Sequence, residues 1–199
     1  MGYTHYWKFL GNNLNVAKRK SIAEDLYNIY YNIIRHTDSF IYLNGCRVYI
    51  YPVFNEYEIF FNGGDREPDE LMDKKEWEER LYKNECPENS HETFRINFEK
   101  DLSSGDFRFC KTARKPYDLM VCISLLRVKN DMGEFMELSS DGDLDEGCWP
   151  YAHEILDRYM GIKELMKNYK RPDKMNDLYG YMKSIVEEEN KNPACFNKI

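Results

Sequence analysis

Two groups of polar side chains in the sequence are candidates for chemistry, and the first contains histidines. His5 lies in a segment that alternates apolar and polar residues, and the pair His91-Glu92 opens a second such segment. If these segments are neighbouring strands, two imidazoles would lie beside a carboxylate, an arrangement suited to general acid–base catalysis. The alternative is a packed histidine whose nitrogens are satisfied by hydrogen bonds within the core.

The second group is a run of cations before an expected helix. Lys111, Thr112 and Arg114 precede Pro116, and proline suits the first turn of a helix. Because unpaired N–H groups and the helix dipole attract anions there, the run predicts a phosphate or carboxylate site, with Asp118 in the first helical turn. The run lacks the glycines of a phosphate-binding loop. The alternative is a helix cap at Thr112 or a neighbouring residue, with Lys111 and Arg114 in ion pairs with surface acids.

Three further residues complete the candidate site. Asp141 follows an expected strand in the turn Ser140-Asp141-Gly142, where loops at a sheet edge commonly carry function. Tyr6 and Trp7 are rings that would stack on a nucleobase. Strand alternation places Tyr6 on one face and His5 with Trp7 on the other. His-Glu-x-x-His, Cys-x-x-Cys and calcium-loop spacings are absent from the sequence, so we expect neither a metal nor a cofactor.

Hydrophobic spacing predicts the elements that position these residues. Helices are expected over 15–35, through 119–126, through 152–159 and over 175–188, the second being the most buried. Expected strands cover 3–10, 40–43, 47–54, 56–61, 91–98, 107–110 and 134–138, with turns at Asn44-Gly45 and at Asn62-Gly63-Gly64. The pattern predicts one α+β domain over 1–199, mainly an antiparallel sheet with packed helices. A charged excursion covers 65–90, and 161–199 form a C-terminal helical segment.

Composition narrows the function classes. The chain has 199 residues, and its 28 Lys and Arg against 35 Asp and Glu give a net charge of −7. A negative chain repels phosphate backbones, so nucleic-acid binding is disfavoured. Apolar runs are too short for a membrane helix, and the first residues lack a signal-peptide pattern. Six scattered cysteines are typical of reduced intracellular thiols, so we expect a cytoplasmic protein.

Several motifs together resemble a known group of proteins. They are Tyr3-Thr4-His5-Tyr6-Trp7, His91-Glu92-Thr93-Phe94, Phe109-Cys110-Lys111-Thr112 with Pro116-Tyr117-Asp118, and Ser140-Asp141-Gly142. In order and approximate spacing the chain is similar, over residues 3 to about 142, to uncharacterised proteins of bacteriophages, large DNA viruses and some fungi. The resemblance implies a viral or mobile-element origin and supplies no reaction.

Two functions follow as expectations. The first is binding, and with it processing, of a small anionic ligand such as a nucleotide: Lys111, Thr112 and Arg114 would supply charge, and His5, His91 and Glu92 acid–base chemistry. The second is a non-enzymatic interaction protein that binds a host or viral protein, for which 16 tyrosines and 11 phenylalanines would form an exposed patch.

Overall fold

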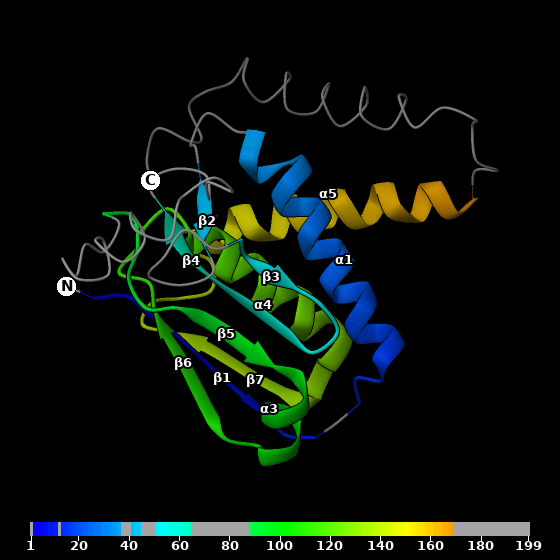
Figure 1. Ribbon diagram of the computed structural model, residues 1–199, viewed down its shortest axis with the longest axis horizontal. Coiled ribbons are helices and arrows are strands. Elements are labelled where there is room, and N and C mark those ends of the chain that lie inside the picture. The colour runs from blue at the N-terminus through cyan, green and yellow to red at the C-terminus, as the bar shows by residue number, and fades with distance from the viewer. Residues whose placement is uncertain (1, 12, 37–40, 45–50, 65–87, 169–199) are drawn as a thin grey trace, which may run out of the picture.

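The computed structural model describes residues 2–11, 13–36, 41–44, 51–64 and 88–168 of the chain (Figure 1). Among these residues four α-helices occur: α1 (Val16–Asn32), α3 (Phe98–Ser104), α4 (Asp118–Met132) and α5 (Trp149–Asn168). The strands are β1 (Thr4–Phe9), β2 (Tyr42–Asn44), β3 (Val53–Phe54), β4 (Glu58–Gly64), β5 (Phe94–Asn97), β6 (Phe107–Lys111) and β7 (Met136–Ser140). No helix in these ranges is long and apolar enough to cross a membrane.

The strands form two antiparallel sheets. In the first, β1 is central and pairs with β6 on one side and β7 on the other. In the second, β4 is central: Ile59 and Phe60 pair with β3 and also with β5, and the end of β4 pairs with β2. Helix α4 packs against α1 and α5, and these three helices lie together beside the sheets (Figure 1). The protein is therefore a single-domain α+β fold, as the sequence predicts.

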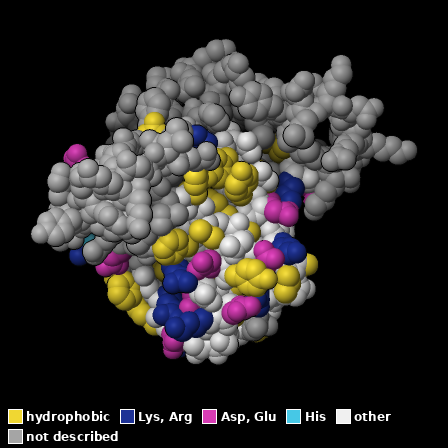
Figure 2. Space-filling model, in the orientation of Figure 1, with side chains coloured by type: hydrophobic (Ala, Val, Ile, Leu, Met, Phe, Trp, Pro, Cys, Tyr) yellow, Lys and Arg dark blue, Asp and Glu magenta, His cyan; other side chains and the backbone are white. Residues whose placement is uncertain are grey.

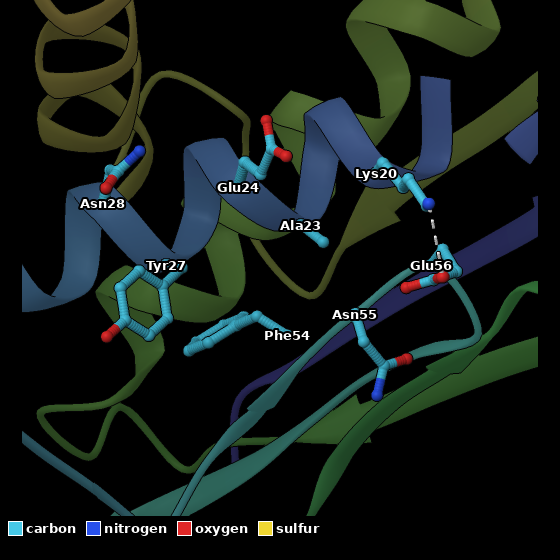
Figure 3. Close-up of a pocket in the computed structure, with 8 residues that line it drawn as sticks. All are labelled: Lys20, Ala23, Glu24, Tyr27, Asn28, Phe54, Asn55 and Glu56. Atoms are coloured by element: carbon cyan, nitrogen blue, oxygen red, sulfur yellow. Dashed lines mark ion pairs between the residues drawn. The ribbon is translucent and has the colours of Figure 1, made fainter. Parts of the chain in front are cut away.

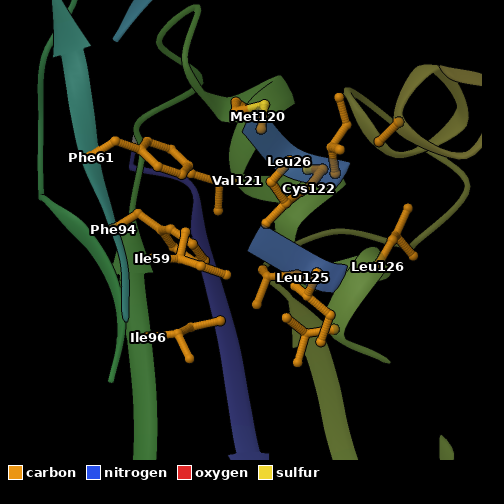
Figure 4. Close-up of a cluster of buried hydrophobic side chains, with 14 of the residues drawn as sticks. Leu26, Ile59, Phe61, Phe94, Ile96, Met120, Val121, Cys122, Leu125 and Leu126 are labelled. Atoms are coloured by element: carbon orange, nitrogen blue, oxygen red, sulfur yellow. The ribbon is translucent and has the colours of Figure 1, made fainter. Parts of the chain in front are cut away.

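The hydrophobic core lies between the β4–β5 pair and helices α1 and α4. Figure 4 shows Phe61, Phe94 and Ile96 from the strands facing Val121 and Leu125 of α4. Every residue of α4 from position 118 to position 128 is buried, which confirms that it is the most buried helix. Aromatic rings such as Phe61 and Phe94, whose centroids are 5.0 Å apart, supply large apolar area to this core.

Buried charges also join the three long helices. Asp25 of α1 is 1% exposed and accepts hydrogen bonds from Arg127 Nε at 2.9 Å, Lys163 Nζ at 2.5 Å and the Tyr159 hydroxyl at 3.1 Å. Arg127 also pairs with Asp131. A buried carboxylate with three donors is satisfied, so this network fixes α1 against α4 and α5.

Two elements differ from the sequence prediction. Strand β4 continues through Asn62 and Gly63, which were expected to form a turn, because the Asn62 amide donates to His91 O at 3.0 Å and holds the strand end in place. A Cβ at residue 63 would lie 1.9 Å from Asn89 O, so glycine is required there by close approach of another segment. The expected strand over 91–98 is shorter, since the Asn97 side chain accepts from Lys100 N and caps α3, which the sequence analysis missed.

The other boundaries agree more closely with expectation. Helix α1 begins at the predicted asparagine cap, where Asn15 accepts from Lys18 N. Strand β7 is shifted by two residues from the predicted 134–138, because Gly133–Phe135 form a short 3-10 helix, so Ser140 belongs to the strand. Helix α5 extends to Asn168. Most of the charged excursion over 65–90 and of the segment over 161–199, including the expected helix over 175–188, lies outside the described residues.

Candidate functional site

His5 occupies the inner face of the β6-β1-β7 sheet and is fully buried. Antiparallel pairing places it opposite Ser140 of β7 and Cys110 of β6. The predicted alternation is confirmed, because His5, Trp7 and Phe9 are buried while Tyr6 and Lys8 are more exposed. The Nδ1 atom of His5 lies 2.7 Å from Ser140 Oγ, at the half-buried end of β7.

The other nitrogen of His5 meets the first turn of α4. Nε2 lies 2.6 Å from Oδ1 of Asp118, which is 2% exposed. The same carboxylate oxygen accepts a hydrogen bond from the buried Thr112 hydroxyl. Asp118 is suited to this place because a negative charge in the first turn is stabilised by the helix dipole. Residues from β1, β7, the loop after β6 and α4 thus form one hydrogen-bonded chain.

This chain has a defined direction. An ionised Asp118 can only accept hydrogen bonds, so the proton facing it must sit on Nε2 of His5. In a neutral imidazole the other nitrogen, Nδ1, is then an acceptor, and the Ser140 hydroxyl donates to it. Ser140, His5 and Asp118 therefore stand in the order hydroxyl, imidazole and carboxylate of a Ser-His-Asp triad, with the two ring nitrogens exchanged, since in serine proteases Nε2 faces the serine.

Two buried donors without partners lie around the same imidazole. The rings of Tyr3 and Trp149 approach His5 edge to face, each with a centroid distance of 5.2 Å. Neither the Tyr3 hydroxyl nor Trp149 Nε1 has a hydrogen-bond partner among the described residues. A buried donor without a partner costs about 1–3 kcal/mol. Burial raises the pKa of Tyr3, and weak hydrogen-bonding contacts with Trp149 and Ser140, too poor in geometry to satisfy the hydroxyl, lower it in part, so the hydroxyl keeps its proton at neutral pH.

Gly142 lies close to the Tyr3 ring. A Cβ at residue 142 would lie 3.3 Å from Tyr3 Cε2 and 3.4 Å from its hydroxyl oxygen. Contacts at that distance are tight, so any larger side chain would press on the ring. Glycine at position 142 therefore lets the turn after β7 pass close to the Tyr3 ring, next to Ser140 at the end of the strand.

The loop between β6 and α4 places a cation over Tyr3. The Arg114 guanidinium lies 4.6 Å from the centroid of the Tyr3 ring, a cation–π contact. Ala113 and Arg114 both have positive φ, 53° and 58°, a conformation that costs non-glycine residues about 1–2 kcal/mol each. Thr112 N and Ala113 N both donate to Tyr3 O, which holds the strained loop against β1. Within the described residues no carboxylate forms an ion pair with Arg114.

The three cysteines of this region are poor nucleophiles. Burial raises the pKa of Cys122 well above its usual value, and the Asp118 charge raises it further. Burial, followed by the Glu92 charge, raises the pKa of Cys110, and burial with Asp118 does the same for Cys148. These thiols stay protonated at neutral pH, and a thiol is far less reactive than a thiolate. Serine is therefore the stronger candidate.

His5, Asp118 and Cys122 are also a possible metal-ligand set. Their ligand atoms lie within 4.8 Å of one another, and all three side chains are buried. The Nε2–Oδ1 distance of 2.6 Å is that of a hydrogen bond, and Cys122 Sγ is 3.8 Å from Nε2. A zinc ion needs nitrogen and oxygen ligands each about 2.0–2.2 Å from the metal, so the arrangement fits a hydrogen-bonded chain better than a metal centre.

The second predicted histidine lies elsewhere. His91 is exposed and interacts through its backbone with Asn62 on β4, in the sheet that does not contain His5. Glu92 lies nearer the site: its carboxylate accepts from Lys111 N at 2.7 Å and its backbone oxygen accepts from the Tyr117 hydroxyl at 2.7 Å. Glu92 thus holds the end of β6 in place, and the structure does not pair the two imidazoles.

The remaining predicted residues divide between the core and the outer face of the sheet. Trp7 is 2% exposed and packs on Phe94. On the outer face the Tyr6 hydroxyl donates to the exposed Asp141 at 2.6 Å, and this bond, the largest cause, lowers the pKa of Asp141. The Lys111 side chain lies against Gly2. The expected cap by Thr112 is wrong, because Tyr117 takes the N-cap position without a side-chain hydrogen bond and Thr112 donates to Asp118.

Sequence analysis missed four members of the site: Ser140, Tyr3, Trp149 and Cys122. Ser140 was assigned to a turn, although the 136, 138, 140 alternation of β7 places it on the inner face. Three of the four motifs quoted for the resemblance, those around His5, Asp118 and Ser140, meet at this one site, and the fourth touches it through Glu92. No family model, no curated protein and no solved structure matches the chain.

Proposed function

We propose that the protein is a serine-dependent hydrolase that acts on small esters bearing an anionic group. The observation that carries the proposal is the hydrogen-bonded chain from Ser140 through His5 to Asp118. It supports nucleophilic catalysis because each member has the protonation role that activation of a hydroxyl requires. Ser140 is half-buried at the end of β7, where the turn that follows the strand begins.

In the proposed first step, Ser140 Oγ attacks the carbonyl or phosphoryl centre of the ester. The hydroxyl proton passes to His5 Nδ1, and the resulting imidazolium is stabilised by the Asp118 carboxylate. The bond to the leaving alkoxide breaks, and His5 returns the proton to that oxygen. Water then hydrolyses the Ser140 ester with His5 again as base, so the enzyme regains its starting state.

The unpartnered donors support stabilisation of the charge that develops in this step. The Tyr3 hydroxyl and the Trp149 indole N–H are buried beside His5 and would donate to an oxyanion. Arg114, exposed above Tyr3 with no ion pair within the described part of the chain, would attract the anionic group of the ester. This retains the sequence-based expectation of a small anionic ligand while moving its contacts toward Arg114.

The test uses a fluorophosphonate, a reagent that phosphonylates activated serines with loss of fluoride. We expect one adduct per molecule, which peptide mass spectrometry locates on Ser140. Ser140→Ala should remove labelling while keeping the thermal melting temperature. Ser139→Ala is the matched control, because Ser139 is the neighbouring serine and lies on the opposite, exposed face of β7.

Two results would overturn the proposal. One is a folded protein that takes up no label over hours at millimolar reagent. The other is an adduct on another residue that persists in Ser140→Ala. If labelling succeeds, a panel of carboxylic and phosphoric esters, with and without a second anionic group, identifies the substrate class. Arg114→Gln should raise the KM for the anionic esters only.

A second candidate function, protein binding, is favoured by the outer face of the β6-β1-β7 sheet. Phe107 and Phe109 are 60% and 57% exposed, and Tyr6 stacks on Phe107 with centroids 5.7 Å apart. On the face drawn in Figure 2, by comparison, hydrophobic side chains gather in separate patches with charged residues between them. Sedimentation of the wild type and of the double variant Phe107→Ser/Phe109→Ser tests self-association through this face. A concentration-dependent dimer that is lost in the variant supports such an interface, and a monomer in both proteins opposes it.

A further inference from the structure

A cavity of about 370 Å³ lies between α1 and the turn that joins β3 to β4 (Figure 3). Its apolar part is formed by Tyr27 and Ala23 of α1 and by Phe54 of β3. The volume falls within the range of small-molecule sites in proteins. None of its lining residues belongs to the Ser140 site, so the cavity needs its own explanation.

Two aromatic rings of the cavity are held in fixed positions. Phe54 contacts Tyr30 and Phe61, with centroid distances of 6.2 and 5.9 Å, and is thereby anchored to the core. Tyr27, which is 50% exposed, contacts the ring of Tyr31 one turn further along α1 at 4.5 Å. Figure 3 shows the Tyr27 and Phe54 rings next to each other on the same side of α1. Ala23, one turn before Tyr27, has no side chain beyond Cβ, which leaves room beside the rings.

The charges around the rings favour a cation. Glu24 and Glu56 line the cavity, and its one lysine, Lys20, already pairs with Glu56 at 3.8 Å. Glu24 has no ion-pair partner within the described residues. The lining therefore carries one net negative charge, and aromatic faces attract cations through their quadrupoles. Two aromatic faces in a lining of net negative charge are a combination that favours organic ammonium groups.

We infer that this cavity binds an organic cation with an alkylated or primary ammonium head. The aromatic faces of Tyr27 and Phe54 contact the head, and the net negative charge of the lining, to which Glu24 contributes, favours its positive charge. The head belongs either to a free small molecule or to a lysine side chain of another protein, since both present the same chemistry. The inference is independent of the proposed hydrolase function, because it uses neither Ser140 nor His5.

Choline is the probe, and 3,3-dimethyl-1-butanol, its uncharged analogue of the same shape, is the control ligand. In ¹H–¹⁵N NMR spectra of the full chain we expect choline to shift the amide signals of α1 and β3 saturably, with a dissociation constant in the millimolar range or below. The alcohol should bind at least about fivefold more weakly, because it lacks the cation–π attraction. Equal binding of both compounds, or no saturable shift, would overturn the inference.

Variants locate the site. Tyr27→Leu removes an aromatic face from an exposed position and should weaken choline binding about fivefold or more. Tyr57→Leu is the matched control, since Tyr57 is 58% exposed in the neighbouring turn and does not line the cavity. Glu24→Gln should weaken choline without changing the affinity for the alcohol. Equal losses in the Tyr27 and Tyr57 variants would contradict the assignment.

Nα-acetyl-lysine methylamide, which keeps the side-chain ammonium group, and a lysine-bearing peptide distinguish the two sources of the ammonium group. Tighter binding of the peptide than of the isolated lysine analogue would identify a protein partner, and equal affinities would identify a small molecule. Fluorophosphonate labelling of Ser140 should be unaffected by Tyr27→Leu. Failure of choline binding and failure of labelling are therefore separate outcomes.

Discussion

Asp118→Asn is the substitution with the most informative expected effect. The carboxylate is buried, lies 2.6 Å from His5 Nε2 and also accepts from Thr112. Asparagine has nearly the same shape but no charge, so the imidazolium formed when Ser140 loses its proton would have no buried counter-charge. At a charge separation of about 4 Å and an effective dielectric constant of about 20, that attraction is worth about 4 kcal/mol.

A loss of about 4 kcal/mol from the transition state corresponds to a rate lower by about a thousandfold. The assay is the second-order rate constant for fluorophosphonate labelling of Ser140, followed by intact-protein mass spectrometry. Asp157→Asn is the control, because Asp157 is an exposed carboxylate on α5. Melting temperatures of both variants verify that they are folded.

The reasoning would be refuted by a folded Asp118→Asn protein whose labelling rate falls less than about tenfold. In that case the carboxylate would act only in holding α4 against β1. A similar loss of rate in Asp157→Asn would equally contradict the account, since it would show that the reaction responds to net charge and not to the His5 contact.

Three further predictions concern stability and titration. Gly63→Ala should destabilise the fold by about 3 kcal/mol in urea unfolding, because its Cβ would overlap Asn89 O, whereas Gly161→Ala, with nothing within 4 Å, should stabilise α5 by up to about 1 kcal/mol. Asp25→Ala should cost about 3–5 kcal/mol, since it leaves the buried Arg127 without this partner, and a loss below about 1 kcal/mol would contradict the proposed role of the network. Tyr6→Phe should raise the pKa of Asp141 toward its usual value in an NMR titration, because the Tyr6 hydrogen bond is the largest cause of the lowered pKa. The stabilisation from that bond is present at pH values above the ordinary aspartate pKa and is lost as the pH falls through the lowered pKa of Asp141.

The face on which His5 lies could be predicted from the sequence because strand alternation is a local property. The alternation of residues 3 to 10 separates His5 from Tyr6, and the structure has the same separation. The burial of α4 was predictable for the same reason, since apolar residues cover most of its circumference. Local patterns thus determine which side chains enter the core.

The partners of His5 were not predictable because they depend on how distant elements pack. Asp118 is 113 residues away and Ser140 is 135 residues away, and both reach His5 only because β7 pairs with β1 and α4 begins above the same sheet. His91 was expected near His5, yet β5 pairs with β4 and not with β1, so His91 lies beside Asn62. Strand order, which a single sequence does not specify, decided which histidine belongs to the site.

The tautomer of His5 is the measurement that tests the central claim most directly. A long-range ¹H–¹⁵N spectrum of protein labelled at histidine, with the His5 signals assigned by His5→Gln, reports which ring nitrogen carries the proton. The account predicts that the neutral ring carries its proton on Nε2, facing Asp118, and has a bare Nδ1 that accepts from Ser140. A proton on Nδ1 would contradict it, because Ser140 could then only accept a hydrogen bond and would have no base to take its proton.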